Sequence, residues 1–462
     1  MDVVVVGGGV AGLLVGIELR KLGHRVSLLE RRPHLGGRVR TAYEGRQTSY
    51  EAGAWRVDAT HTRCRSLFAH HEVDLTPALS ATVLGSHAAP SRTGRFAGLT
   101  AWGAAALADG VPQADAADRD SGYTGSTDSA NGSDPYSAEG PFLVAPQGFS
   151  LLVERMEKEA VALGVVIRKD ARVVDLLRCG DGYAVRTRER RGSRFVAQTL
   201  RADRVVLCVP PHAWRGWSAM RDAKSLAAAV EAEALHHVYV RWKDPAGPMP
   251  EASHLDESLG QVVSSQYDGS RWWQISYSSG RVARLWHDYA MHDEKGFLDR
   301  IKAAMRKLVT FDSDVDLKRH FWPFAFHTWR AVPHFDLDDA VTRSVRPNPV
   351  RLPGVYCAGE AFSSHQGWIE GALQTTELVL DAFRRGEPTG VAVASPRWTV
   401  FAEGIPLDVS KFRGVHPGGE GALSNHVGEH VDELMQHVGH SDHAWAIVYS
   451  LRAQSCSTTA SR

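Results

Sequence analysis

The chain has 462 residues, 43% of them hydrophobic, so its length predicts several domains and its composition allows a sizeable core. Its 53 basic and 53 acidic side chains cancel, which argues against a nucleic-acid or membrane-surface partner. No hydrophobic run approaches the about 20 residues that a membrane helix needs.

The cysteines and the N-terminus indicate a reducing compartment. The five cysteines are an odd number and none is spaced as Cys-x-x-Cys, which does not favour a disulfide framework. A strand-like run begins at Asp2, which leaves no room for a signal peptide before it. We therefore expect a cytoplasmic protein, and its oligomeric state stays unknown at this point.

The first thirty residues are typical of a strand, a Gly-rich turn, a helix and a second strand. Val3 to Val6 is a continuous β-branched run, as in a buried parallel strand. A helix is predicted over residues 11–22 and a strand over 25–30. Together they form one βαβ unit.

Further elements follow from hydrophobic patterning. Residues 109–140 are polar and rich in turn formers, which predicts a surface loop. Residues 384–396 predict a linker before a short C-terminal module. Helices are predicted over 148–163, 297–308 and 368–384, and strands over 165–168, 172–177, 183–187, 195–199, 204–209, 238–242, 272–277 and 354–358.

Residues 7–12 contain the G-x-G-x-x-G pattern of dinucleotide-binding sites. Gly7 permits a tight turn, Gly9 lets the backbone approach a pyrophosphate, and Gly12 allows helix and strand to pack closely. Glu30 ends the second strand, where a carboxylate can accept hydrogen bonds from ribose hydroxyls. The pattern predicts a dinucleotide at the helix N-terminus without distinguishing NAD from FAD, and the alternative is a chance Gly-rich turn.

The next segment, Glu30-Arg-Arg-Pro-His-Leu-Gly-Gly-Arg-Val-Arg40, resembles the corresponding stretch of flavin-dependent amine oxidases. The resemblance implies a Rossmann-like FAD-binding domain in which Arg38 lies against the FAD phosphates. Arg31 and Gly37 belong to the same cofactor-binding segment. The alternative is a solvated basic loop.

The sequence Gly354-Val-Tyr-Cys-Ala-Gly-Glu-Ala361 carries the same resemblance. It implies that Glu360 approaches the ribityl and phosphate region of FAD. Val173 fits the position whose backbone contacts the adenine in this family. Because no cysteine occupies the place of covalent attachment in some members, the resemblance implies non-covalent FAD.

A third resembling segment is Gly367-Trp-Ile-Glu-Gly-Ala372, which opens the last predicted helix of this region. In the family, the N-terminus of this helix points at the flavin ring, and its positive end stabilises negative charge on a reduced flavin. Gly367, Trp368 and Ile369 are therefore cofactor candidates, and Trp368 is also a catalytic candidate.

The segment Tyr50-Glu-Ala-Gly-Ala-Trp-Arg-Val57 bears on the substrate. It resembles L-amino acid oxidases, in which an arginine here clamps the substrate α-carboxylate, more than monoamine and polyamine oxidases. Arg56 takes that role, since arginine suits bidentate carboxylate recognition, and Gly53 and Ala54 are cofactor candidates. The alternative for Arg56 is a salt bridge to FAD or to a nearby aspartate.

The implied reaction is oxidative deamination. A hydride passes from Cα–H to flavin N5, and water hydrolyses the resulting imine to an oxo acid and ammonia. Family oxidases usually hold a water near the flavin with a lysine. The strand that best matches this position, residues 259–263, has Gln261 in place of the lysine, so Gln261 is a catalytic candidate. The expected electron acceptor is O2 or another acceptor.

The C-terminal module resembles cytochrome b5, through Pro406-Leu-Asp-Val-Ser-Lys-Phe412 and His416-Pro-Gly-Gly419. In that family, the first His and a second His 24 residues later ligate haem iron from opposite faces. His416 and His440 have this spacing and imply a bis-His haem b that transfers electrons without an open coordination site. The alternative is a His-rich surface tail that binds metal.

The sequence thus predicts an α/β and α+β multidomain chain with a small α+β cytochrome b5-like module. The boundaries are 1–65, 141–215 and 345–385 for a discontinuous FAD-binding domain, 66–140 and 216–344 for a mixed-sheet substrate domain, 386–396 for a linker and 397–455 for the haem module. The expected function is FAD-dependent oxidation of an L-amino acid, with possible electron transfer to haem. The alternatives are an amine or polyamine oxidase, and a binding protein that retains FAD without catalysis.

Overall fold

The fold was taken from a computed structural model of the chain. It describes residues 1–45, 47–78, 142–242, 272–306, 315–330, 336–385 and 398–457. Within these ranges, no helix combines the length and apolarity needed to cross a lipid bilayer. The predicted loop at 109–140, the strand at 259–263 and the linker at 386–396 lie outside the described residues.

A parallel sheet of five strands, in the order β16-β12-β1-β2-β8, forms the centre of the larger part of the molecule. The predicted βαβ unit is confirmed, because β1, α1 and β2 follow in this order and the two strands pair in parallel. The strands and this helix are β1 (Asp2–Val6), α1 (Val10–Lys21), β2 (Arg25–Leu29), β8 (Val166–Arg168), β12 (Arg204–Leu207) and β16 (Val355–Cys357).

The run of valines in β1 is buried on both faces of this sheet. Val3 and Val5 pack into one hydrophobic cluster with the helices, whereas Val4 and Val6 pack into a second cluster on the opposite face. Successive side chains of a strand point to opposite faces, so a strand covered on both sides needs apolar residues at every position.

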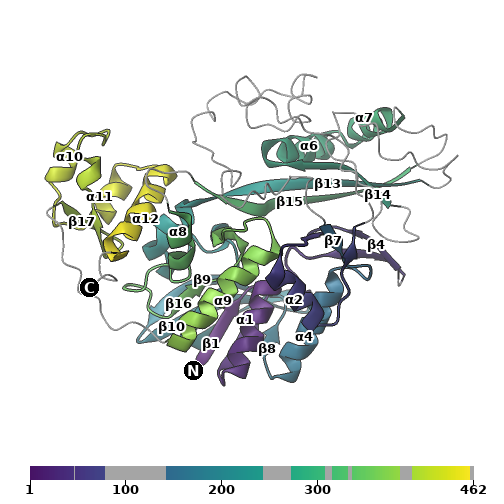
Figure 1. Cartoon of the computed structure of the whole chain (residues 1–462), viewed down its shortest axis with the longest axis horizontal. Helices are drawn as coiled ribbons and strands as arrows, with labels where there is room; N and C mark the ends of the chain where they lie inside the picture. Colours follow the sequence, from purple (N-terminus) through teal and green to yellow (C-terminus); the bar gives the residue numbers. More distant parts are fainter. Residues whose placement is uncertain are drawn as a thin grey trace.

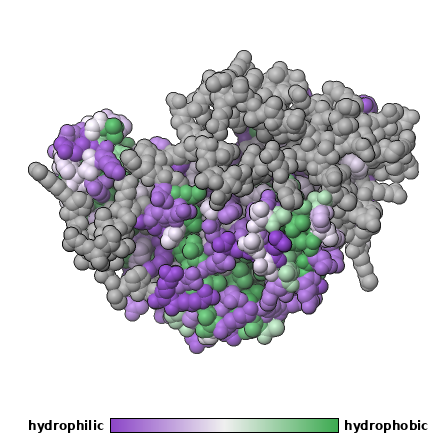
Figure 2. Space-filling view, viewed as in Figure 1, coloured by the Kyte–Doolittle hydropathy of each residue, from purple (hydrophilic) through white to green (hydrophobic). Residues whose placement is uncertain are grey.

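Helices cover one face of the sheet and an antiparallel meander covers the other (Figure 1). On the face shown in Figure 2, the helical layer presents mostly hydrophilic residues with hydrophobic ones between them. The helices besides α1 are α2 (Thr62–His70), α4 (Ser150–Ala162) and α9 (Ile369–Arg385). The meander consists of β9 (Ala171–Cys179), β10 (Gly182–Arg191) and β11 (Arg194–Ala202), which contain the strands predicted at 172–177, 183–187 and 195–199.

A second sheet, in the order β14-β13-β15, is antiparallel and lies beside the first unit (Figure 1). Its strands are β13 (Val230–Trp242), β14 (Trp272–Ser279) and β15 (Val315–Trp329). Helices α6 (Gly280–His292) and α7 (Glu294–Arg306) pack on one face through a cluster that includes Val238 and Trp286. The sequence found only the C-terminal end of β13, because residues 231–234 in its first half alternate glutamate with alanine, and both residue types have weak strand propensity.

Short elements connect these units. The small strands are β3 (Thr41–Glu44), β4 (Gln47–Glu51), β5 (Val57–Asp58), β6 (Thr76–Pro77) and β7 (Phe142–Val144). The short helices are η3 (Pro211–Ala213), η4 (Ala219–Ala223), α5 (Lys224–Ala228), α8 (Leu337–Ser344) and η6 (Glu360–Phe362). The expected boundary between residues 65 and 66 falls inside α2, which packs in the same cluster as α1.

The C-terminal module has its own hydrophobic cluster, which includes Val400, Leu407 and Trp445. Its elements are β17 (Thr399–Ala402), β18 (Ile405–Asp408), η7 (Ser410–Phe412), α10 (Gly421–Ser424), α11 (Asp432–His437) and α12 (Asp442–Ser457).

The module is fixed to the rest of the chain by buried polar contacts. The carboxylate of Glu403 accepts hydrogen bonds from the backbone N–H and the hydroxyl of Ser225, at 2.9 and 2.7 Å. Tyr449 on α12 donates to the carbonyl of Ala340 at 2.7 Å and stacks on Trp329. These groups are mostly buried, so the module docks as an integral part of the fold.

Candidate active site

The Gly-rich turn between β1 and α1 has the geometry that the sequence predicted. Gly7 has a φ of +104°, a conformation that favours glycine. A Cβ on Gly12 would lie only 1.9 Å from the carbonyl oxygen of Gly7, so a larger residue at position 12 would force turn and helix apart. A Cβ on Gly9 would meet no protein atom closer than 3.9 Å.

Glu30 lies directly beside this turn and is buried. One of its carboxylate oxygens accepts a hydrogen bond from the backbone N–H of Gly8 at 2.8 Å, and the other accepts from the N–H of Arg32 at 2.9 Å. Each oxygen keeps a lone pair for a further donor, as recognition of a ribose requires.

The second Gly-rich segment runs alongside the first. The N–H of Gly36 donates to the carbonyl of Gly8 at 2.8 Å, and Gly9 and Gly36 form an isolated parallel bridge. Gly37 has a φ of +61°, and a Cβ there would lie 3.4 Å from the Cα of Gly9. The two segments that resemble cofactor-binding motifs therefore meet in space, and Arg31 is exposed at their edge.

Arg38 and Glu360, two predicted cofactor residues, form an ion pair although 322 residues separate them. Glu360 also accepts from the Nδ1 of His327 at 2.7 Å and from the N–H of Gly367 at 3.0 Å. Burial alone would raise the pKa of Glu360, but the charges of Arg38 and His327 and their hydrogen bonds lower it well below its ordinary range. Glu360 is therefore ionised at neutral pH.

The N-terminus of α9 begins beside this network, since Gly367 contacts Glu360 and Ile369 is the first helical residue. Two buried nitrogens, Nε2 of His327 and Nε1 of Trp368, have no hydrogen-bond partner among the described residues. Buried polar atoms are normally paired, so these two indicate a bound group that supplies acceptors or donors.

Arg56 is buried, with 7% of its surface exposed, and lies among aromatic rings. Its guanidinium carbon is 4.1 Å from the ring centre of Phe142, 4.8 Å from that of Trp55 and 5.7 Å from that of Trp368. His61 packs edge-on against Trp368, and burial lowers the pKa of His61, so it is uncharged at neutral pH. The guanidinium thus lies between aromatic faces, which supply no counter-charge, and Asp58 interacts with it electrostatically.

Two further predicted site residues, Gly53 and Ala54, pack against the backbone of Arg38. Gly53 packs so closely that a Cβ would lie 2.0 Å from the carbonyl oxygen of Arg38, and the N–H of Ala54 donates to the same oxygen at 3.0 Å. Val173 is buried in β9, on the opposite face of the sheet from α1. Gln261 lies outside the described residues.

Two carboxylates inside the matched motifs hold helix ends. Glu370 accepts hydrogen bonds from the N–H groups of Arg63 and Cys64, the first turn of α2, at 3.3 and 2.8 Å. Glu51 accepts from the N–H of Phe149 at the start of α4, at 2.8 Å. The sequence did not indicate that Glu51 and Glu370 cap helices or that His327 belongs to the site. The hydrogen-bond partners of all three residues lie far away in the sequence.

His416 and His440 come together in the C-terminal module, with ring centres 6.3 Å apart and ring planes at 39°. The Nδ1 of His440 contacts the carbonyl of Met435 at 3.3 Å, which leaves its Nε2 available as a ligand. The Nδ1 of His416 accepts from the N–H of Gly418 at 3.1 Å, a contact that favours a proton on Nε2 instead.

Comparison with known proteins gives the family. The sequence model of the family "Flavin containing amine oxidoreductase" matches residues 126–379, more than half of the chain. The chain belongs to this family. A model of the NAD(P)-binding Rossmann-like domain matches residues 5–69, the βαβ unit and its extension. The protein is therefore an FAD-dependent oxidoreductase of the amine oxidase type, and its predicted Rossmann-like domain is confirmed.

Individual relatives are more distant. A flavin-dependent L-tryptophan oxidase, RebO, from Lentzea aerocolonigenes is 45% identical over 62 residues, which is 13% of this chain and 13% of that protein. A putrescine oxidase variant redesigned for cofactor binding has a TM-score of 0.57 at 15% identity, over 83% of this chain and 99% of that one. A putative protoporphyrinogen oxidase from Exiguobacterium sp. 255-15 has a TM-score of 0.53 at 15% identity, over 83% and 98%. The two structures share the fold.

The residues of this amine oxidase family member fit FAD. A Cβ at Gly9 would make only ordinary van der Waals contacts, so the protein does not crowd the position where a pyrophosphate would approach, whereas Gly7 and Gly12 are tightly packed. Glu30 offers acceptors beside that turn, and the buried unpaired nitrogens of His327 and Trp368 lie where the α9 N-terminus begins. When FAD is bound, it supplies the hydride-accepting chemistry, and the protein supplies binding, orientation and charge.

Proposed function

We propose that this protein oxidises the C–N bond of an L-amino acid. The proposed division of labour follows the sequence except at α2: residues 1–65 with the rest of α2, 141–215 and 345–385 bind FAD, the remainder of 66–140 and 216–344 form the substrate side, and 386–396 link them to the module at 397–455. The match to an L-tryptophan oxidase over part of the chain supports an amino acid as substrate.

The observation that carries the substrate class is the buried Arg56. Its aromatic neighbours Phe142 and Trp368 fix the guanidinium plane without neutralising its charge. A carboxylate can bind such a planar fork through two parallel hydrogen bonds. Trp368 also belongs to the turn that opens α9, so an acid bound to Arg56 lies near the proposed flavin end of the site.

The protein's own groups then have distinct tasks. Arg56 binds and orients the α-carboxylate, and Trp368 with Phe142 excludes water from the charge pair. The ionised Glu360 and Arg38 hold the loop before α9 in place, through the contact of Glu360 with Gly367. The imine product hydrolyses in water to an oxo acid and ammonia.

The test compares L-amino acids with the amines that their decarboxylation gives, using anaerobic bleaching of the flavin absorbance. We expect only the amino acids to bleach the flavin. Arg56→Ala should raise the KM for the amino acid about 30-fold or more, because it removes a buried charge-assisted pair of about 2–5 kcal/mol. Arg65→Ala is the matched control, since the Arg65 side chain is exposed and, within the described part of the chain, donates a hydrogen bond only to the carbonyl of Ala59. An unchanged KM in Arg56→Ala would refute the assignment.

Amine oxidation is the second candidate function. The three cation–π contacts can explain why Arg56 is buried without any substrate carboxylate. This candidate predicts that an amine bleaches the flavin faster than the matching amino acid. It also predicts that Arg56→Ala lowers stability with little change in the KM for the amine.

We also propose that the C-terminal module binds haem b between His416 and His440. The 6.3 Å between their ring centres is close to the separation that two imidazoles need on opposite sides of one metal ion at bonds of about 2.0 Å. Val415 and Val438, which precede the two histidines by one and two residues, are 72% and 57% exposed, and a porphyrin would cover apolar surface of this kind. The contact between His416 and Gly418 must break for ligation.

Reconstitution with haemin tests this module. A sharp Soret band at one haem per chain is expected in the wild type and is expected to disappear in His416→Ala and His440→Ala. His437→Ala, an exposed histidine of the same module, is the control that keeps the band. If haem accepts electrons from the flavin site, anaerobic amino acid should also reduce the haem. Peroxide released in proportion to substrate while haem stays ferric would exclude that transfer.

A further inference from the structure

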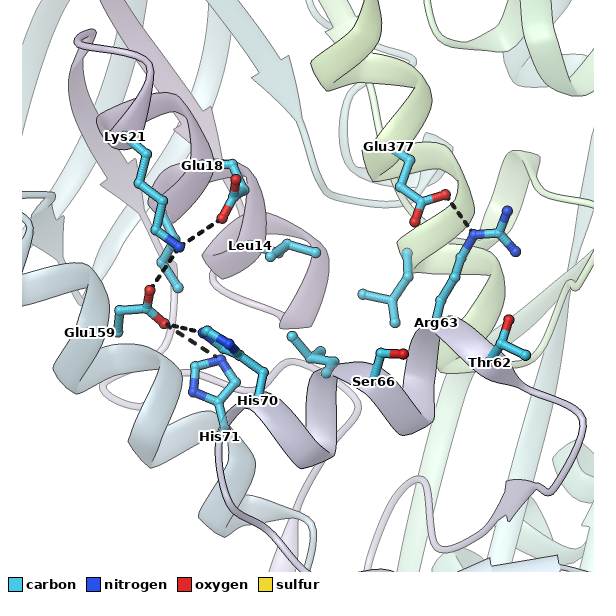
Figure 3. Close-up of a pocket in the computed structure, with 13 residues that line it drawn as sticks. Leu14, Glu18, Lys21, Thr62, Arg63, Ser66, His70, His71, Glu159 and Glu377 are labelled. Atoms are coloured by element: carbon cyan, nitrogen blue, oxygen red, sulfur yellow. Dashed lines mark hydrogen bonds and ion pairs between the residues drawn. The ribbon is translucent and has the colours of Figure 1, made fainter.

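A cavity of about 370 Å³ lies among the helices that cover the parallel sheet (Figure 3). It is lined by residues of α1, α2, α4 and α9. At one end of it, His70 and His71 at the C-terminal end of α2 face Glu159 of α4 (Figure 3). Neither the proposed oxidation nor the haem module uses these side chains.

The three side chains converge on one point. The Nε2 atoms of His70 and His71 are each 3.6 Å from the same carboxylate oxygen, Oε2 of Glu159. All three candidate ligand atoms lie within 4.8 Å of one another. The distance of 3.6 Å is longer than a hydrogen bond, but it is close to the about 3.3 Å between neighbouring ligands of a tetrahedral zinc ion.

The surroundings orient these ligands. The ammonium of Lys21 is 2.9 Å from the other oxygen of Glu159, so Oε2 remains directed at the histidines. Lys21 also pairs with Glu18, which offsets its charge near a bound cation. A guanidinium nitrogen of Arg155 donates to the carbonyl of His71 at 2.6 Å and so fixes the end of α2 against α4.

We propose that His70, His71 and Glu159 bind a divalent transition-metal ion of the zinc type. Two neutral imidazoles and one carboxylate are a ligand set that zinc accepts, and the adjoining cavity has room for a water as the fourth ligand. His70 is 60% exposed at its side chain, so the ion can enter from solvent, whereas His71 is buried. The bound ion would join α2 to α4 and stabilise the helical layer over the sheet.

The test uses the full chain with FAD bound, freed of metal by a chelator and then titrated with zinc chloride. We expect one site with micromolar or tighter affinity, and a rise in melting temperature of about 3 °C at zinc 100-fold above its dissociation constant. Cobalt(II) in place of zinc should give the visible absorbance of a tetrahedral site.

His70→Ala is the first variant, because its exposed ring can be removed without opening the core, and it should weaken zinc binding at least tenfold. Glu159→Gln keeps the shape of the side chain and should weaken binding similarly. The chain has 22 histidines, so His292→Ala, at the exposed end of α6, serves as the control that binds as the wild type does. Wild-type affinity weaker than about 100 µM, or unchanged affinity in both variants, would overturn the proposal.

Discussion

Replacing Glu360 by Gln tests the charge network at the start of α9. The change keeps the shape of the side chain and its acceptor for Gly367, but it removes the counter-charge of Arg38. Breaking a fully buried pair costs about 3–5 kcal/mol. Because the Arg38 side chain is 33% exposed, water compensates part of this loss, and we expect about 2–3 kcal/mol.

The stabilisation by ionised Glu360 should depend on pH. The pKa of Glu360 in the folded protein lies below its ordinary value of 4.5. The stability from its charged form is therefore present above about pH 4.5 and is lost as the pH falls further, toward the lowered pKa. The difference in unfolding free energy between the wild type and Glu360→Gln should shrink accordingly in acid.

Thermal unfolding by circular dichroism, with the FAD content of each variant, provides the assay. For a chain of this length, the expected loss corresponds to a melting temperature lower by about 2–3 °C at neutral pH. Glu377→Gln is the matched control, since Glu377 lies on α9 itself and pairs with Arg63 but is 55% exposed at its side chain, so it should change stability by less than about 0.5 kcal/mol. Equal melting temperatures for the two variants, or a difference that does not shrink in acid, would refute the reasoning.

Three further changes test buried contacts. Gly12→Ala should cost more than about 2 kcal/mol and reduce FAD content, because its Cβ would lie 1.9 Å from the carbonyl oxygen of Gly7; fluorescence of released flavin measures this. Leu28→Ala removes a fully buried side chain of β2 and should lower the free energy of unfolding by about 2–5 kcal/mol in a urea titration. Glu403→Gln should weaken the buried contact with Ser225 by about 1–3 kcal/mol and speed proteolysis of the C-terminal module, and an unchanged digestion rate would contradict that role.

The local order of the fold was predictable from sequence. The βαβ unit, the meander of β9 to β11 and the helices α4, α7 and α9 all follow from hydrophobic periods that neighbouring residues set. The turn at Gly7 was predictable for the same reason, since its positive φ is a property of a few residues.

The candidate site was predictable only where a motif named its residues. Arg38, Glu360 and Gly367 were expected to contact a cofactor, but their contact with one another was not. His327 had no sequence signal, because its partner Glu360 lies 33 residues away on another element. Its Nδ1 hydrogen bond became visible only in the folded chain.

The cluster of His70, His71 and Glu159 was also only partly visible in the sequence. The adjacent pair His70 and His71 could be read from the sequence, but Glu159 lies on another helix and reaches them only after α2 and α4 pack together. Sequence by itself determined the βαβ unit, the Gly-rich turn and the order of the motifs, because those depend on neighbouring residues. Tertiary structure decided which distant polar groups pair, such as the carboxylate of Glu370 with the backbone N–H of Cys64 in α2, because a buried polar group needs a hydrogen-bond partner.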